Sequence, residues 1–252
     1  MKIFYLIILF FCISIPPIFS EGINNPAVYY SFSGNTQDQS GNNKDATSYG
    51  ATLTTDRFGN TNSAYYFDGS SYMSLPTSIL ENTNQLTYSL WIKTPQYNGS
   101  DWPAFIGSYT NSKSLNVSLG IWQNSGHLWN EIDTTNGNYA MEGNLAIPWN
   151  TWFHAALVYN GATITEYING QKGRSVNASG NLKNVIGLYL GQYGRGANLT
   201  ASLDEVYIYN AALSETEIGQ VMNDNTNIPE HSSLILFTLI FLFARTIGRN
   251  KK

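Results

Sequence analysis

Hydrophobic residues in the middle of the chain recur with a period of two, which is typical of β-strands, and not with the 3.6-residue period of a helix. The alternating runs are short and rich in β-branched and aromatic residues, and Gly/Asn-rich turn clusters such as 40–43 separate them. The predicted strands are 28–32, 64–67, 72–75, 86–92, 115–122, 153–159, 163–168, 186–191 and 202–209. Many short strands at regular spacing predict an all-β fold, an antiparallel β-sandwich of the jelly-roll kind.

Two short motifs refine this picture. Asn160-Gly161 and Asn169-Gly170 are hairpin turn sequences, so the runs 153–159 and 163–168 should pair as an antiparallel hairpin. The stretch 214–217 reads Ser-Glu-Thr-Glu, a capping box, and apolar residues follow it at helical spacing. We therefore expect one short C-terminal helix, with a structural role.

The two ends of the chain differ from its middle. Residues 1–20 combine Lys2, an apolar run over 3–15 and the small residue Ser20, which predicts a cleavable signal peptide and a route through the secretory pathway. The only cysteine, Cys12, lies in this segment, so the mature domain (21–225) has no disulfide. After a linker (226–231) we predict a membrane segment over 232–248 and a basic tail over 249–252. A lipid-anchor signal and full secretion are the alternatives, and in each case the domain is extracellular or at the cell surface.

Three blocks of sequence carry a family resemblance. The first joins 30–42 to Arg57-Phe58-Gly59 and to 66–69, the second is 86–93, and the third runs from Trp149 to Gly170 and continues at 190–191 and 203–214. Their order and spacing resemble the laminin-G-like, concanavalin A-like jelly-roll superfamily. Because the first and last strands carry the two end blocks, the chain ends should meet. We also expect Trp91 to fill the space between the two sheets.

Charge excludes one class of partner. All 17 acidic residues lie between Glu21 and Glu230, against 8 Lys and Arg, which gives this stretch a net charge of −9. Nucleic-acid binding depends on clustered bases that neutralise phosphates, so nucleic acid is not an expected partner.

Glu131 and Asp133 are the best candidates for catalysis, because residues two apart in a strand share one face. The resemblance adds that concanavalin A-like hydrolases of β-glucans use a Glu-x-Asp-x-x-Glu run, in which two glutamates flank the scissile bond. Asn136 occupies the third position here and cannot act as an acid, and Glu142 lies too far along the chain. We therefore predict that the protein is not an enzyme, with a glycoside hydrolase that uses Glu131 and Asp133 as the alternative.

A structural Ca²⁺ is the one cofactor that the chain suggests. The resemblance implies it, because Asp38 and Asp204 match positions where relatives often hold an ion that joins the chain ends. Asn35, Asn42 and Asn43 could add oxygen ligands. The competing interpretation is that these residues only stabilise turns.

The remaining features favour binding at a surface. Four N-x-S/T sequons predict glycosylation, in turn-like stretches at Asn98, Asn177 and Asn198 and in a predicted strand at Asn116. Five aromatic residues outside the family blocks are candidates for ligand contact: Tyr97, Trp102, Tyr109, Trp122 and Trp129. We therefore predict a non-catalytic extracellular or cell-surface module that binds a glycan or protein ligand in adhesion or recognition. A structural surface-coat component is a third possibility.

Overall fold

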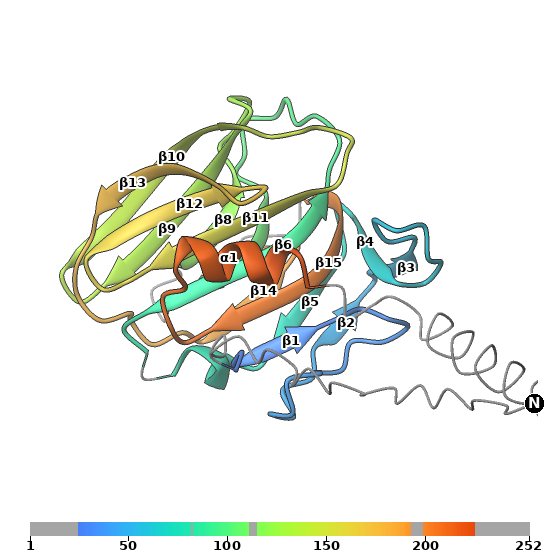
Figure 1. Ribbon diagram of the computed structural model, residues 1–252, viewed down its shortest axis with the longest axis horizontal. Coiled ribbons are helices and arrows are strands. Elements are labelled where there is room, and N and C mark those ends of the chain that lie inside the picture. The colour runs from blue at the N-terminus through green and yellow to red at the C-terminus, as the bar shows by residue number, and fades with distance from the viewer. Residues whose placement is uncertain (1–24, 82, 111–114, 193–198, 225–252) are drawn as a thin grey trace, which may run out of the picture.

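The computed structural model describes residues 25–81, 83–110, 115–192 and 199–224, which form two antiparallel sheets packed face to face (Figure 1). The predicted signal peptide, linker, membrane segment and basic tail lie outside the described residues. Among the residues that are described, no helix is long and apolar enough to cross a membrane.

The strands divide into an eight-stranded and a seven-stranded sheet. The eight-stranded sheet has the order β13 (Gln171–Asn177), β12 (Thr163–Ile168), β11 (Phe153–Tyr159), β6 (Leu86–Lys93), β15 (Thr200–Tyr209), β4 (Ala64–Asp68) and β3 (Thr52–Thr54), with β1 (Val28–Tyr30) also paired to β15. The seven-stranded sheet has the order β10 (Gly137–Ala146), β9 (His127–Thr134), β8 (Leu115–Ile121), β7 (Ala104–Tyr109), β14 (Gly187–Leu190), β5 (Tyr72–Leu75) and β2 (Thr47–Tyr49). The helical elements are η1 (Thr77–Leu80) and α1 (Glu215–Met222).

This architecture confirms the predicted all-β sandwich. The predicted hairpin is β11–β12, and β1 pairs with β15, so the first and last described strands are neighbours. Helix α1 begins with the expected capping box, in which Ser214 and Glu217 exchange hydrogen bonds, and its apolar side packs on the outer face of the eight-stranded sheet. The prediction missed six strands, β2, β3, β7, β9, β10 and β13.

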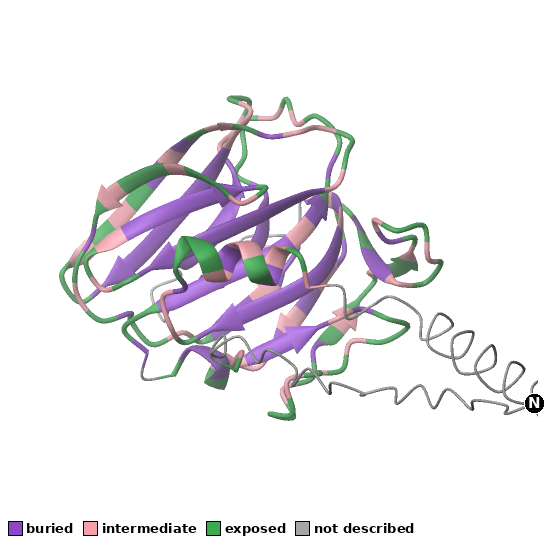
Figure 2. Cartoon of the chain, in the orientation of Figure 1, coloured by how far each residue is buried: buried purple, intermediate pink, exposed green. Residues whose placement is uncertain are grey.

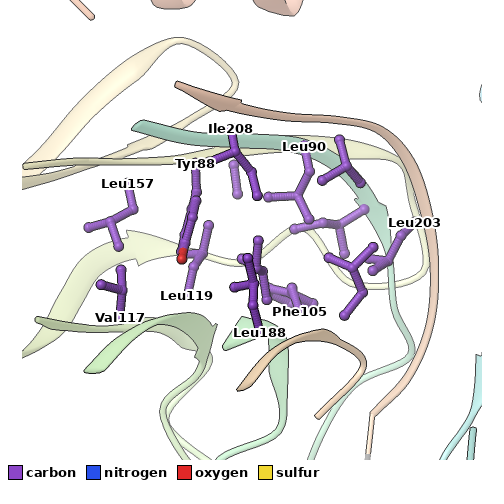
Figure 3. Packing of buried hydrophobic residues seen from close by; sticks show 14 of the residues in the cluster. Tyr88, Leu90, Phe105, Val117, Leu119, Leu157, Leu188, Leu203 and Ile208 are labelled. Atoms are coloured by element: carbon purple, nitrogen blue, oxygen red, sulfur yellow. The ribbon is translucent and has the colours of Figure 1, made fainter. Parts of the chain in front are cut away.

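The core lies between the sheets, where alternate residues of each strand meet (Figure 3). In β6 the inward residues are Leu86, Tyr88, Leu90 and Ile92, all fully buried. The same alternation turns Trp91 to the opposite, outer face, so the prediction that Trp91 fills the space between the sheets is wrong. Edge strands β13 and β3 are mostly exposed, in contrast to the buried strands of the centre (Figure 2).

A single buried carboxylate joins the sheets along one edge. Glu166 of β12 is fully buried and accepts hydrogen bonds from Asn130 Nδ2 (3.3 Å) of β9, Asn144 N (2.8 Å) of β10 and Arg174 N (3.3 Å) of β13. A Cβ atom at either Gly143 or Gly173 would overlap this carboxylate. Three donors in an enclosed space compensate for the cost of burying the charge.

Candidate functional site

The outer face of the eight-stranded sheet carries a cluster of buried charges around Arg57. The guanidinium lies 2.6 Å from Glu205 Oε2 and 3.5 Å from Asp204 Oδ2, and both carboxylates belong to β15. It is also sandwiched between the rings of Phe58 (4.2 Å) and Trp91 (4.5 Å). Glu205 has a φ of +45° at the point where β15 bulges against β6, which places two successive carboxylates beside one arginine. We call Arg57, Trp91, His154, Asp204 and Glu205 the arginine cluster.

Burial sets the protonation of this cluster. It raises the pKa of Asp204 to about 8, the charge of Glu205 adds to the shift and Arg57 opposes it. Burial also lowers the pKa of His154 to about 3, with a further contribution from Arg57, so this histidine is neutral and its Nε2 lies 2.7 Å from Ser89 Oγ.

The proposed calcium ligands do not come together. Asp38, in the loop after β1, accepts backbone hydrogen bonds from Tyr29, Ser40 and Lys44. Burial raises its pKa, but the Ser40 side chain and these backbone donors outweigh burial, so the pKa of this carboxyl is lowered. Asp204 lies instead in the arginine cluster.

The three asparagines have local roles in the same turn. Asn35 accepts from Gln37 N, Asn42 donates to Pro26 O and Ala27 O, and Asn43 has a φ of +56°. Among the residues that the structure describes, no three His, Cys, Asp or Glu side chains are grouped so as to hold a metal ion.

The outer face of the seven-stranded sheet has a different character. Strand pairing places one residue from each strand in a continuous row: Thr47, Ser74, Tyr189, Gly107, Ser118, Glu131 and Ala140. Their neighbours along the strands point into the core, so this row faces outward. Most of these side chains are small or carry hydroxyl groups, and larger aromatic side chains flank them.

Four of these aromatic side chains form what we call the tyrosine row. Tyr49 stacks on Tyr72 with ring centroids 4.7 Å apart, and Tyr109 stacks on Tyr189 at 5.6 Å. Tyr72 and Tyr189 join the two pairs through an edge contact at 5.9 Å. Gly187 permits the second stack, because a Cβ there would lie 2.5 Å from the Tyr109 ring and 2.6 Å from the Tyr189 ring. The hydroxyl groups of Tyr109 and Tyr189 also hydrogen-bond each other at 3.1 Å, so stacking and this bond together fix the second pair.

Two tryptophans lie at the other end of this face. Trp129 of β9 is nearly buried although it points outward, and Trp102 in the loop between β6 and β7 is 37 % exposed. Their ring centroids are 6.3 Å apart. Tyr97 in the same loop lines a separate cavity of about 200 Å³. Trp122 lies half-buried in the turn after β8.

Two polar atoms between the tyrosines and the tryptophans have no hydrogen-bond partner. Ser118 Oγ and Asn116 Oδ1 are fully buried, and both belong to the outward side of β8, because Val117 and Leu119 point into the core. Buried polar atoms normally have partners, so these two are suited to a ligand or to ordered water. Tyr189 lies nearby, and burial, together with its contact with Tyr109, raises its pKa to about 12, so that its hydroxyl keeps its proton.

Comparison with protein families assigns the chain. A model described as the concanavalin A-like lectin/glucanases superfamily matches residues 67–219. The protein belongs to this superfamily. A search of curated protein sequences finds no match.

Solved structures share the fold of this concanavalin A-like domain. The binding domain of Paraclostridial Mosquitocidal Protein 1 superposes with a TM-score of 0.66 at 20 % identity, over 79 % of this chain and 52 % of that one. The receptor binding domain of botulinum neurotoxin C/D mosaic serotype gives 0.63 and 17 %, over 80 % and 51 %. Domain 4 of AbnA, a GH43 extracellular arabinanase from Geobacillus stearothermophilus solved with arabinotriose, gives 0.59 and 23 %, over 79 % and 98 %. The chain thus spans about half the length of the toxin domains and nearly all of the arabinanase domain.

The candidate acid pair of this concanavalin A-like domain is engaged in other contacts. Glu131 and Asp133 share the outer face as expected, but Asn138 Nδ2 donates to Glu131 Oε1 at 2.6 Å, and Lys183 Nζ binds both oxygens of Asp133 at 2.9 and 3.0 Å. Asn136 lies in the β9–β10 turn and donates to Ser179 Oγ. Glu142 bonds His127, which is the largest contribution to its lowered pKa.

The sequons differ in accessibility. Asn98 is exposed in the β6–β7 loop, and Asn177 is exposed as the last residue of β13, so it does not lie in a turn. Asn116 is fully buried and its Nδ2 donates to Lys183 O, so in the folded domain this nitrogen is engaged and not open to a glycan. Asn198 lies outside the described residues.

Sequence reasoning found one tyrosine of the row, Tyr109, and missed Tyr49, Tyr72 and Tyr189. A signal for two of them was present. In β5 and β14 the alternate residues are the aliphatic Met73, Leu75, Leu188 and Leu190, so the tyrosines between them had to face outward. Tyr49 could not be found in this way, because the polar strand β2 has no aliphatic alternation.

Proposed function

We propose that this protein is a non-catalytic glycan-binding module whose site is the outer face of the seven-stranded sheet. The observation that carries the proposal is the pair of unpartnered buried atoms, Ser118 Oγ and Asn116 Oδ1, lying between the tyrosine row and the tryptophan pair. Binding sites commonly combine aromatic surface with a few precisely placed polar groups. Sugar hydroxyl groups can supply the hydrogen bonds that these two atoms lack.

The names of the structural neighbours support a carbohydrate ligand. Arabinotriose is bound to the arabinanase domain, and a botulinum neurotoxin C structure is described in terms of cell entry dependent on two ganglioside molecules. Because the arabinanase domain is matched over nearly its whole length, it is the more informative comparison. A protein ligand remains the other partner in this proposal, and the same face would hold it.

The proposal is for binding without catalysis. In the alternative, Glu131 would need a second carboxylic acid across a scissile bond, and Asn136 stands where that group is required. Asn138 and Lys183 already hold the two carboxylates that are present. A structural surface-coat component is the third possibility. Such a component needs no ligand site, so it does not account for outward polar atoms that lack partners.

We further propose that the module works outside the cell, carried there by the signal peptide over 1–20 and held near a membrane through 232–248. We include a structural Ca²⁺ at Asp38 or Asp204 in this proposal. Either carboxylate supplies only part of a calcium ligand set, so solvent or further residues would complete it.

The test is a glycan array probed with the full chain, with binding confirmed by calorimetry. Removal of the half-buried ring in Tyr189→Ala should weaken binding at least tenfold, about 1.4 kcal/mol. Tyr66→Ala is the matched control, because Tyr66 is an exposed tyrosine on the outer face of the other sheet and its loss should leave binding unchanged. The bound sugar should be recovered intact. No binding to any glycan, or equal loss in both variants, would disprove the site, and released sugar fragments would favour the hydrolase.

A further inference from the structure

Sequons that stay accessible in the folded domain are the places where the fold can hold a covalent glycan. Asn98, in the β6–β7 loop, is exposed, and so is Asn177 at the end of β13. Asn116 is fully buried and its Nδ2 donates to Lys183 O, so a glycan on this nitrogen is incompatible with the fold. An N-x-S/T sequence on the surface of a secreted protein is an acceptor for N-glycosylation. In the part of the chain that the structure describes, Asn98 and Asn177 are thus the two sequons that can hold a glycan.

The sequon at Asn98 lies in a tightly folded turn. The Tyr97 hydroxyl accepts a hydrogen bond from Asp101 N at 3.2 Å. Gly99, the middle residue of the sequon, lies against this side chain, since a Cβ there would overlap the Tyr97 hydroxyl group. Tyr97 is half-buried and packs against the hydrophobic core, so it holds the turn against the domain. The exposed Asn98 side chain therefore gives a glycan a defined starting point.

The same loop carries one member of the tryptophan pair of the proposed binding face. Trp102 follows the turn, and its ring centroid lies 6.3 Å from that of Trp129. Pro103 fixes this placement, because its carbonyl accepts a hydrogen bond from the last residue of β8 at 2.9 Å and lies where a Cβ at Gly120 would overlap it. Asn98 is four residues from Trp102, which is at most about 14 Å even in a fully extended chain.

The surface of Trp102 suits a sugar attached at this distance. The apolar faces of sugar rings pack on aromatic side chains, and Trp102 has 37 % of its surface exposed. A glycan that packs there occupies the tryptophan end of the face and leaves the tyrosine row open.

We infer that Asn98 carries an N-linked glycan whose first sugars pack over Trp102, and that this glycan limits the access of ligands to the tryptophan end of the seven-stranded sheet. This inference rests on the proposed function and its secretory route, and it adds a modification that regulates the same site.

The first measurement is the occupancy of the sequons. The full chain is produced in a secreting eukaryotic cell, and the glycosylated asparagines are identified by mass spectrometry after enzymatic removal of the glycans in heavy-oxygen water. Asn98 and Asn177 should be occupied in the folded protein, and Asn116 should not. An unoccupied Asn98, or an occupied Asn116 in folded protein, would overturn the inference.

The second measurement follows Trp102 directly. Oxidation by N-bromosuccinimide, located by peptide mapping, reports the accessibility of each tryptophan ring. Trp102 should react at least threefold more slowly in the glycosylated chain than in Asn98→Gln. Ser100→Ala also removes the sequon but keeps Asn98, so it should react as fast as Asn98→Gln. Asn177→Gln is the matched control, because it removes a glycan from an edge strand of the other sheet and should leave the rate at Trp102 unchanged.

The third measurement is affinity. The full chain and each variant are probed on one glycan array that includes arabinotriose, and every oligosaccharide that gives signal with any of them is titrated by calorimetry. Loss of the Asn98 glycan should tighten binding at least threefold, because the oligosaccharide then contacts the tryptophan pair as well as the tyrosine row. Loss of the Asn177 glycan should leave the affinity unchanged.

The outcomes are distinguishable. Equal reactivity of Trp102 in the glycosylated chain and in Asn98→Gln would overturn this inference, and binding that is still lost in Tyr189→Ala would leave the proposed function standing. Equal affinity in all variants would also overturn it, because the glycan would then not limit the ligand. If no oligosaccharide binds any form of the chain, the proposed function fails and the limit on ligands fails with it, whereas protection of Trp102 would still show a glycan over the tryptophan pair.

Discussion

The two outer faces of this sandwich use buried polar groups for opposite purposes. On the eight-stranded sheet, Arg57 contacts two buried carboxyl groups and is enclosed by two aromatic rings. On the seven-stranded sheet, Ser118 and Asn116 each keep one buried atom without a partner beside a row of tyrosines. The first face contributes to the stability of the fold, and the second is the site that we propose for a ligand.

This difference shows which of the two faces is built from the sequence blocks that carry the family resemblance. Arg57-Phe58, Trp91, His154 and Asp204-Glu205 come from separate blocks of the family pattern, and the structure brings them together in one sealed cluster. The tyrosine row is drawn mostly from outside those blocks. The residues that carry the family resemblance therefore include this buried cluster, whereas the proposed binding face draws on side chains outside the resembling blocks.

The largest effect should come from breaking the arginine cluster. Arg57→Met keeps much of the apolar contact with Phe58 and Trp91 but leaves Asp204 and Glu205 buried without a cation. We expect a loss of about 3 to 5 kcal/mol in the free energy of unfolding, measured by urea denaturation. Arg174→Met, at an exposed arginine of β13, should change it by less than about 0.5 kcal/mol. If both variants were equally stable, the two faces would not differ as described.

A smaller effect should appear in the pH dependence of stability. The folded pKa of Asp204 is about 8 and its ordinary value is 3.8, so between these values the folded state binds more protons than the unfolded state. Stability from this group therefore falls as pH rises through that range. His154 acts in the opposite direction, since its pKa falls from 6.5 to about 3 and stability is lost as pH drops below 6.5.

Between pH 6.5 and 8 only Asp204 of this pair changes stability. We expect the free energy of unfolding to decrease by about 1 to 2 kcal/mol across this interval, since the limit is about 1.4 kcal/mol per pH unit for one group. Asp204→Asn should remove the decrease. A slope that persists in this variant would assign the effect to another group.

The smallest effect tests the seven-stranded sheet. Ser118→Ala removes a hydroxyl that has no partner in the free protein, so the free energy of unfolding should stay the same or rise slightly. Affinity for the glycan should nevertheless fall by about 0.5 to 1.5 kcal/mol, the value of one hydrogen bond, in calorimetric titrations. Ser202→Ala, on the outer face of the other sheet, is the control, and it should leave both the free energy of unfolding and the affinity for the glycan nearly unchanged. A clear loss of stability in Ser118→Ala would mean that this hydroxyl has a structural partner.

Alternation and turn chemistry were sufficient to predict most of the sandwich. The strand runs 72–75, 153–159 and 163–168 coincide with β5, β11 and β12, because each combines alternating apolar residues with clear turns. Strands β9 and β10 were missed because their inward positions include Asn130 and Gly143, which serve Glu166 and interrupt the apolar pattern. Strand β13 has no inward apolar run because it lies at the edge.

The candidate site was less accessible from the sequence. Tyr109, Trp102 and Trp129 were identified as aromatic residues outside the family blocks, but nothing in the chain indicated which of them are neighbours. Tyr49, Tyr72 and Tyr189 are distant in sequence and meet only through the pairing of β2, β5 and β14. Trp91 was assigned to the wrong face because the size of the side chain was given more weight than its position in the alternation.

The enclosed carboxylate of Glu166 links three other positions of the chain to it and to one another: Asn130, Gly143 and Gly173. We expect a homologue that keeps this glutamate to keep glycine at positions 143 and 173, since a Cβ atom at either position would overlap the carboxylate where it now lies. A homologue that loses it is released from both constraints at once, and Asn130 then loses its acceptor as well. These positions should therefore change as a group in evolution, and an alignment of relatives should show them covarying even though they are separated by up to 43 residues.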